Sequence, residues 1–468
     1  MDGSSTTAGG AGRRLTIALL GGLLGTALTA APAAAAGTAA PPPAAARAGF
    51  PLLGDSPTEA NGESAEPSIS ADGRYVAFAS MASNLADDDN NGDWDVYVRD
   101  RADGSTERVS VSRTGGDPDG PSYGPRISAN GRFVAFYSRA SNLVAGDTNH
   151  RWDVFVRDLA DGSTERVSVP DGADSDSGEQ GNGDSFDDES RPVISADGRF
   201  VGFASTASNL VEGGNHTSHV YVRDRRRQRT SQVDVSSRDQ AANRFSYGIA
   251  LSADGRYAAF NSQATNLVAH DTNNTWDIFV RDLVDGRTSR VNLSDDGAAA
   301  NTFSYLPAIS GDGRLVAFES DATNLVAGDT NEASEVFARD LDDDSTERVS
   351  ANADGGAPNK YCGSPDVSRD GRWVAFAGNA TNLVDDDTNG VSDVFVRDRT
   401  RGSTERASVD SDGTESNGYS GFPSLSRTGQ YVAFVSTATN LVPDDTNGKA
   451  DVFVHDLDSG TTDRVSVG

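Results

Sequence analysis

Short apolar runs alternate with longer polar stretches along most of this chain, in an order that repeats. In the first copy, residues 75–79 and 96–99 are apolar at nearly every position, which is typical of strands covered on both faces. A short apolar run around Ile69 precedes them, and residues 108–111 follow with alternating apolar and polar side chains. The pattern predicts four strands, with the innermost around Ile69 and a half-solvated outermost strand at 108–111.

Two Asp-Gly pairs punctuate this unit. Asp72-Gly73 stands between the first two predicted strands, and Asp103-Gly104 stands between the last two. A tight hairpin turn requires a positive φ, which glycine adopts without steric cost. The four strands are therefore expected to run antiparallel to one another.

The unit occurs seven times. Its opening, SADGRYVAF at Ser70, returns in related form at Ser128, Ser195, Ser252, Ser310, Ser368 and Ser426. Repeats of this kind form a closed propeller or an open solenoid. A solenoid needs polar capping repeats, yet the first and seventh copies are as apolar as the others. We expect an all-β fold, a seven-bladed β-propeller of four-stranded antiparallel blades, over residues 57–468, with repeats starting near residues 66, 124, 191, 248, 306, 364 and 422.

The motif S-x-D-G-R, followed by a V-A-F strand and a V-F-V-R-D strand, resembles the WD40-like propeller repeat of the TolB family. The resemblance implies the propeller fold. It does not select a function, because this repeat serves envelope-associated binding proteins and also the non-catalytic propellers of some serine peptidases. TolB-like propellers usually have six blades and a separate N-terminal domain, whereas this sequence shows seven copies.

The first residues are patterned as an export signal. Arg13 and Arg14 precede an apolar stretch over residues 15–30, and alanines through Ala36 offer a cleavage site. We expect residues 1–36 to be a signal peptide, 37–56 a flexible leader, and the product to be secreted, extracellular or associated with the cell wall. The general secretory and twin-arginine routes both remain open. The single Cys362 cannot form an intrachain disulfide and is expected to be a buried packing residue.

The chain is strongly acidic, with a formal charge of −30 and a pI near 4.4. Such a surface repels nucleic acids and anionic membranes. We expect a monomer without membrane insertion whose partner is a protein, a peptide or a glycan.

The antiparallel order of the strands also determines on which face of the ring each connection lies. The two tight turns of each copy lie on one face of the ring, and the two long connections, from second to third strand (B–C) and from fourth strand to the next copy (D–A), lie on the other. Long loops carry most binding sites, so the long-connection face is the expected functional face.

The B–C loops resemble calcium loops. In the first copy Asp87, Asp89, Asn91 and Asp95 stand at alternating positions, with Gly92 at the bend and the carbonyl of Asp93 available. Oxygen donors spaced in this way suit a hard cation such as calcium, which would have a structural role. The sixth copy repeats the set as Asp385, Asp387, Asn389, Val391 and Asp393. Four copies keep three donors each: Asp147, Asn149 and Asp153; Asp271, Asn273 and Asp277; Asp329, Asn331 and Glu335; Asp445, Asn447 and Asp451. Asp and Asn also rigidify loops by side-chain to backbone hydrogen bonds without any metal, and this alternative stays open.

The D–A connections carry a second recurrent set. Asn243 and Asn301 stand four residues before Tyr247 and Tyr305, and Tyr123 holds the same place in the second copy. Amides beside aromatic faces suit a glycan or a peptide at the mouth of the central channel. Packing between blades is the competing interpretation.

No catalytic constellation emerges from the sequence. The five histidines do not repeat, and the string G-x-S-x-G, which occurs at residues 120–124, does not stand between a strand and a helix as a nucleophile elbow does. We therefore expect a non-catalytic binding or scaffold propeller, stabilised by calcium. The alternative is an extracellular propeller hydrolase or lyase with a metal at the central channel.

Overall fold

The computed structural model describes residues 58–87, 89–175, 178–186, 191–329, 331 and 333–468. The predicted signal peptide and nearly all of the leader, residues 1–57, lie outside the described residues. Twenty-eight strands form seven separate sheets of four strands, each sheet built from consecutive strands of the chain. No helix occurs among the described residues. The seven-bladed β-propeller is confirmed.

The blades follow one another along the chain. Blade 1 comprises β1 (Ser64–Ile69), β2 (Tyr75–Ser80), β3 (Asp95–Asp100) and β4 (Ser105–Arg108). Blade 2 comprises β5 (Ser122–Ile127), β6 (Phe133–Ser138), β7 (Asp153–Asp158) and β8 (Thr164–Arg166). Blade 3 comprises β9 (Val193–Ile194), β10 (Phe200–Ser205), β11 (His219–Asp224) and β12 (Arg229–Gln232). Blade 4 comprises β13 (Ser246–Leu251), β14 (Tyr257–Ser262), β15 (Asp277–Asp282) and β16 (Arg287–Arg290).

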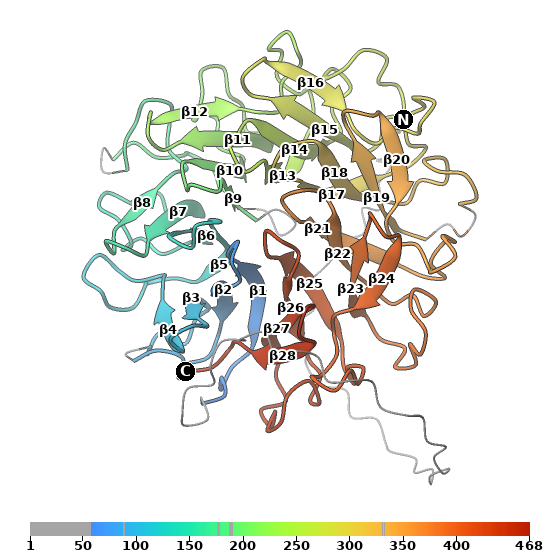
Figure 1. Cartoon of the computed structure of the whole chain (residues 1–468). Coiled ribbons are helices and arrows are strands. Elements are labelled where there is room, and N and C mark those ends of the chain that lie inside the picture. The colour runs from blue at the N-terminus through green and yellow to red at the C-terminus, as the bar shows by residue number, and fades with distance from the viewer. Residues whose placement is uncertain (1–57, 88, 176–177, 187–190, 330, 332) are drawn as a thin grey trace, which may run out of the picture. The chain divides into compact units, whose positions relative to one another are not determined.

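The remaining three blades have the same organisation. Blade 5 comprises β17 (Ser304–Ile309), β18 (Leu315–Ser320), β19 (Glu335–Asp340) and β20 (Ser345–Arg348). Blade 6 comprises β21 (Cys362–Val367), β22 (Trp373–Gly378), β23 (Asp393–Asp398) and β24 (Ser403–Arg406). Blade 7 comprises β25 (Ser420–Leu425), β26 (Tyr431–Ser436), β27 (Asp451–Asp456) and β28 (Thr461–Arg464). The first strand of each blade lies nearest the common axis (Figure 1).

The hydrophobic core lies between the blades. One cluster joins Val96 and Val98 of blade 1 to Phe136 of blade 2, and another joins Val76 of blade 1 to Val452 of blade 7. Within every blade a pair of aromatic rings stacks across the second and third strands, with centroids 5.7–6.1 Å apart. Because blade 7 packs on blade 1 in the same way as other neighbours do, the ring is closed.

Backbone hydrogen bonds complete the closure on the tight-turn face. The turn after each innermost strand donates an amide to the corresponding turn of the next blade, in the order Ala71 to Ala129, Asn130 to Ala196, Ala196 to Ala253, Ala253 to Gly311, Gly311 to Arg369, Arg369 to Arg427, and Arg427 back to Ala71. Residues 58–60 also pair with residues 466–468, through the Glu59–Val467 bridge. This bridge repeats the Val409–Glu415 pairing found inside a D–A connection.

The outermost strand was placed wrongly from the sequence. In blade 1 it is Ser105–Arg108 and not 108–111, because the Asp103-Gly104 turn leads directly into pairing with β3. Ser110, expected on the solvated face, is fully buried. Its hydroxyl donates to the Asp95 carboxylate at 2.6 Å, which explains why a polar residue is retained there.

Recurrent arginines tie the second and third strands together. Arg74 forms an ion pair with Asp100 at 2.6 Å. The same pairing recurs as Arg132–Asp158, Arg199–Asp224, Arg256–Asp282 and Arg372–Asp398. Cys362 is fully buried and free, as predicted. Within the described part of the chain, no helix is long and apolar enough to cross a membrane.

Candidate functional site

The two long connections of each blade are joined by one repeated contact. In blade 1 the Asn61 amide donates to the Ser83 hydroxyl at 3.0 Å, and its carbonyl oxygen accepts from the Ser83 amide at 2.9 Å. Asparagines at equivalent positions do the same in five other blades, namely Asn182, Asn243, Asn301, Asn359 and Asn417. In blade 2 the carboxylate of Asp119 accepts from both the amide and the hydroxyl of Ser141. The B–C and D–A connections therefore lie side by side on one face.

This contact assigns a structural role to two predicted ligand-binding residues. Asn243 and Asn301 use both amide atoms to hold a threonine of the neighbouring loop, Thr265 and Thr323 respectively. Both asparagines are exposed. Contact of these residues with a ligand stays a prediction.

The predicted calcium loop of blade 1 separates into two groups. Asp89, Asn91 and Asp95 come together: the Asn91 amide nitrogen donates to Asp95 at 2.8 Å, and its oxygen accepts from the backbone amide of Asp93 at 2.9 Å. Asp87 and the Asp93 side chain are exposed instead. In the sixth copy Asp387, Asn389 and Asp393 come together in the same way, and Asp385 is exposed.

An arginine that sequence reasoning missed lies within each of six such groups. Arg108, the last residue of β4, places Nη1 3.4 Å from Asp89 and 3.6 Å from Asp95. We call the two carboxylates, the asparagine and the arginine of one blade an arginine cage. The other cages are Arg166 with Asp147, Asn149 and Asp153; Arg290 with Asp271, Asn273 and Asp277; Arg348 with Asp329, Asn331 and Glu335; Arg406 with Asp387, Asn389 and Asp393; and Arg464 with Asp445, Asn447 and Asp451.

Each cage is buried and electrostatically connected. The nitrogen to oxygen distances span 2.5–4.0 Å, and no cage arginine has a side chain more than 10% exposed. Burial raises the pKa of Asp95 and of Asp153 to about 6. The carboxylates of blades 5, 6 and 7 each retain one oxygen without a hydrogen bond, on Asp329, Asp387 and Asp445.

A calcium ion does not fit at the place that the cage arginine occupies. Calcium takes six to eight oxygen ligands, but the cage asparagine directs its NH₂ group to the carboxylate and its oxygen to the loop backbone. A guanidinium already supplies positive charge beside both carboxylates. In blade 7 three carboxylates, Glu59, Asp445 and Asp451, have oxygens within 4.8 Å of one another, yet Arg464 contacts all three. Calcium binding by these loops stays a prediction.

Blade 3 lacks the cage. Its corresponding residues are Gly213, Asn215, His219 and Gln232, and Asp234 replaces the usual serine or asparagine. His219 Nδ1 lies 2.7 Å from the Asp234 carboxylate, and the Gln232 side chain donates to the same carboxylate at 3.0 Å. The arginine is therefore absent from the one blade that has lost the loop carboxylates.

Aromatic side chains gather at the long-connection ends of the inner strands. The three predicted tyrosines each contact another aromatic ring there: Tyr123 lies between Trp94 and Trp152, at 5.6 and 5.9 Å. Tyr247 lies between Phe245 and Trp276, at 6.2 and 5.4 Å, and Tyr305 lies 5.9 Å from Phe303. We call the following set the aromatic rim: Trp94, Tyr123, Trp152, Phe186, Phe245, Tyr247, Trp276, Phe303, Tyr305, Tyr361 and Tyr419.

Part of the aromatic rim is unusually exposed. Among the described residues, the exposed large apolar side chains are Met81, Phe245, Val284, Phe303 and Tyr419. Three of them immediately precede the innermost strand of blade 4, 5 or 7, with exposed fractions of 47%, 42% and 38% for Phe245, Phe303 and Tyr419. Met81 directly follows β2, on the same side of blade 1, and only Val284 lies on the opposite face. The other four side chains share the long-connection face, with Phe245 and Phe303 on the adjacent blades 4 and 5.

A buried carboxyl lies below the rim between blades 5 and 6. Glu319 accepts hydrogen bonds from Ser334 Oγ at 2.9 Å, the Ser364 amide at 3.2 Å and the Tyr361 hydroxyl at 3.3 Å. Burial raises its pKa to about 7. Sequence reasoning missed it because Glu319 is a single departure within an otherwise apolar strand.

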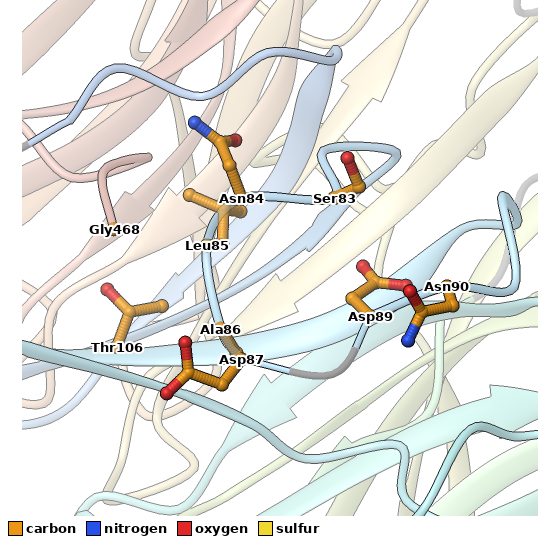
Figure 2. Close-up of a pocket in the computed structure, with 9 residues that line it drawn as sticks. All are labelled: Ser83, Asn84, Leu85, Ala86, Asp87, Asp89, Asn90, Thr106 and Gly468. Atoms are coloured by element: carbon orange, nitrogen blue, oxygen red, sulfur yellow. The ribbon is translucent and has the colours of Figure 1, made fainter.

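An open pocket of about 540 Å³ lies beside the B–C loop of blade 1 (Figure 2). Its wall includes two predicted calcium ligands, Asp87 and Asp89, together with Thr106 of β4 and Gly468. None of the residues that line it belongs to the aromatic rim. The pocket and the rim are therefore separate features of the long-connection face.

No protein-family model matches the chain, and no curated protein matches it significantly. Solved structures do. The β-propeller domain of the Trilobed protease from Pyrococcus furiosus is 12% identical with a TM-score of 0.52, covering 86% of this chain and 97% of that one. Acylaminoacyl peptidase from Pyrococcus horikoshii is 14% identical with a TM-score of 0.50, covering 86% and 52%. TolB from Acinetobacter baumannii is 14% identical with a TM-score of 0.39, covering 84% and 80%. At these identities the first two likenesses show the propeller fold alone.

Proposed function

We propose that this protein is a secreted, non-catalytic binding propeller. Its site is the aromatic rim, and its partner is a protein segment that combines apolar and basic side chains. The observation that carries the proposal is the exposure of Phe245, Phe303 and Tyr419 at equivalent positions of three blades. Large apolar side chains that stay exposed on one face are what a protein interaction site requires.

The negative charge around the rim favours a basic partner. The connections around the rim are rich in acidic residues, for example Asp385 and Asp386 in blade 6 and Asp412 in the following D–A connection, all of them exposed. The whole chain carries a formal charge of −30. An apolar centre with an acidic surround is complementary to a basic segment, and long-range attraction accelerates its association.

The composition of the exposed part favours a protein segment over a glycan. Phenylalanine and methionine provide no hydroxyl or amide for sugar hydroxyls, whereas they pack readily against aliphatic and aromatic side chains. Loops held by the arginine cages and the asparagine contacts stay in place before binding, which lowers the entropic cost of association.

Selection of short random peptides on the purified protein tests this proposal. We expect enrichment of sequences that contain lysine or arginine beside apolar residues. The double variant Phe245→Ser/Phe303→Ser should weaken their binding by about tenfold or more, since central aromatic contacts dominate interface energies. Binding should also weaken as salt is raised.

Val284→Ser is the matched control. Val284 is 72% exposed on the opposite face, so its replacement should leave peptide binding unchanged. Peptides that ignore the Phe245 and Phe303 substitutions, or a protein that binds neutral glycans and no peptide, would contradict the proposal.

A further inference from the structure

The buried carboxyl of Glu319 is attached to the aromatic rim through its own blade. It stands on β18, directly opposite Tyr305 in the ladder between β17 and β18. The next residue, Ser320, donates its hydroxyl to the carbonyl oxygen of Phe303 at 2.9 Å. Tyr305 and Phe303 both belong to the rim, and Phe303 is one of its exposed side chains. Glu319 therefore lies next to the surface where we expect the partner to bind.

Blade 6 supplies the groups that face this carboxyl. The Oε2 atom of Glu319 accepts from the Tyr361 hydroxyl at 3.3 Å and from the Ser364 amide at 3.2 Å. A Cβ atom at Gly363 would overlap with both the Glu319 carboxyl and the Tyr361 hydroxyl. Glycine at this position leaves room for the two polar groups to meet, so the carboxyl and the rim tyrosine are fitted to each other.

Blade 7 has the same tyrosine without the carboxyl. Tyr419 holds the place of Tyr361, and its hydroxyl likewise lies over a glycine, Gly421. The preceding blade has Ala377 where blade 5 has Glu319. Among the described residues, the Tyr419 hydroxyl makes no hydrogen bond. Tyr419 is exposed, whereas Tyr361 is half-buried, so the tyrosine that bonds the carboxyl is the more buried of the two.

No cation of the protein offsets the charge of Glu319. Within the part of the chain that the structure describes, no arginine, lysine or histidine forms an ion pair with it. Burial raises the pKa of Glu319 to about 7. Burial, followed by the charge of Glu319, holds the pKa of Tyr361 well above its usual range. The tyrosine therefore remains a donor, while the carboxyl changes its charge near neutral pH.

The other titratable groups around Glu319 are not cations either. They are Tyr305 on β17, Asp321 after β18, Glu335 on β19, and Cys362 on β21 beside Tyr361. Burial raises the pKa of the Cys362 thiol, which stays neutral. Glu335 is paired with Arg348 inside the cage of blade 5. Ionisation of Glu319 thus adds a negative charge under the rim.

We propose that Glu319 is a positioning residue of the aromatic rim. Its ionised carboxylate holds the Tyr361 hydroxyl and places a negative charge beneath the aromatic surface, so the rim binds a basic segment more tightly when Glu319 is ionised. Protonation removes the charge and weakens the bond from Tyr361, because a hydrogen bond to an ionised acceptor is about twice as strong as a neutral one. This inference rests on the proposed function, which supplies the basic partner.

Peptide affinity at two pH values tests the effect on the rim. The probe is a peptide from the selection with both ends blocked, which contains lysine or arginine but no histidine, aspartate, glutamate or cysteine. We expect it to bind the purified protein on the order of fivefold more tightly at pH 8 than at pH 6. Glu319→Gln keeps the size of the side chain without its charge and should remove this dependence. Asp153→Asn, which removes a carboxyl of the blade 2 cage, should keep it.

Tyr361→Phe is the second variant, and it leaves Glu319 in place. Loss of a donor to the carboxylate raises the pKa of Glu319, so the pH at which binding tightens should move upward. Tyr419→Phe is the matched control. Because the Tyr419 hydroxyl bonds no carboxyl, that pH should not move in this variant, whatever its effect on affinity.

A titration without any peptide separates this inference from the proposed function. In protein labelled with carbon-13 at the Cζ atom of tyrosine, the NMR signal of Tyr361 is identified by its loss in Tyr361→Phe. This signal should shift with a midpoint near pH 7 in the original protein, and should not do so in Glu319→Gln. The Tyr419 signal should lack this midpoint in both proteins.

Three results would overturn the role of Glu319. They are peptide binding that is equally tight at pH 6 and pH 8, a Glu319→Gln variant that keeps the pH dependence, and a Tyr361 signal that does not titrate near pH 7. Absence of any basic peptide that binds, with a Tyr361 signal that does titrate, would instead overturn the proposed function, and the role of Glu319 in binding with it.

Discussion

Blade 3 and the other six blades differ in the buried polar side chains that lie beside the B–C loop. Six blades place an arginine between two loop carboxylates, as Arg166 does with Asp147 and Asp153. Blade 3 has Gly213, His219 and Gln232 at the corresponding places and pairs His219 with Asp234. The arginine and both carboxylates have changed together, within one chain.

The difference shows that a cage is one electrostatic unit. A buried charge that loses its partner costs about 3–5 kcal/mol, whereas exchange of a whole buried ionic group for a neutral arrangement is close to neutral. Separate loss of the arginine or of the carboxylates would leave a buried charge behind. Blade 3 avoids this cost because all of its partners differ at once.

The largest expected effect follows from removal of a cage arginine. Arg166→Met leaves Asp147 and Asp153 buried without a positive partner, and should lower the free energy of unfolding by about 3–5 kcal/mol. Gln232→Met in blade 3 is the matched control and should cost less than about 1.5 kcal/mol. Urea denaturation measures both. Similar losses in the two variants would show that the cage has no special electrostatic role.

A second experiment rebuilds the cage in blade 3. His219→Asp alone places a carboxylate beside Asp234 without any arginine, and should lower stability by about 2 kcal/mol or more. Addition of Gln232→Arg should recover most of this loss, so that the two changes couple by about 2 kcal/mol in a double-mutant cycle. Strict additivity of the two substitutions would contradict the idea of a single unit.

The pH dependence provides a third test. Burial raises the pKa of Asp153 to about 6, above its ordinary value, so the folded protein keeps a proton that the unfolded chain has lost. Unfolding then releases a proton, and the stabilising contribution of this group is lost as pH rises from about 4 to about 6. We expect Asp153→Asn to reduce the gain in stability between pH 7 and pH 5 by about 1 kcal/mol. A gain of the original size in the variant would show that Asp153 is not the responsible group.

The smallest expected effect concerns calcium. Because each cage carries its own guanidinium, the melting temperature in calcium chloride should equal that in EGTA. If the loops do bind the ion, calcium at one hundred times its dissociation constant would stabilise the protein by about 2.7 kcal/mol. A shift of that size would support calcium binding by these loops.

Local patterns in the sequence predicted the blades well. The alternation of apolar runs with Asp-Gly turns is decided by neighbouring residues, and it located the inner strands correctly; in blade 1 these are β2 and β3. The outermost strand was misplaced because S-T-E-R carries no apolar signal of its own. Its position is determined by pairing with β3 across the Asp103-Gly104 turn.

The sequence by itself determined the repeat, the number of blades and which connections share a face. It also grouped Asp89, Asn91 and Asp95 correctly, since these residues lie on one short loop. Only the tertiary structure showed that an arginine lies among these three residues, because Arg108 comes from another strand. The spacing of oxygen donors along a loop does not say whether they contact a metal ion or a guanidinium. The exposure of Phe245 and Phe303 was likewise decided only by the tertiary structure, because it depends on which side chains pack around them.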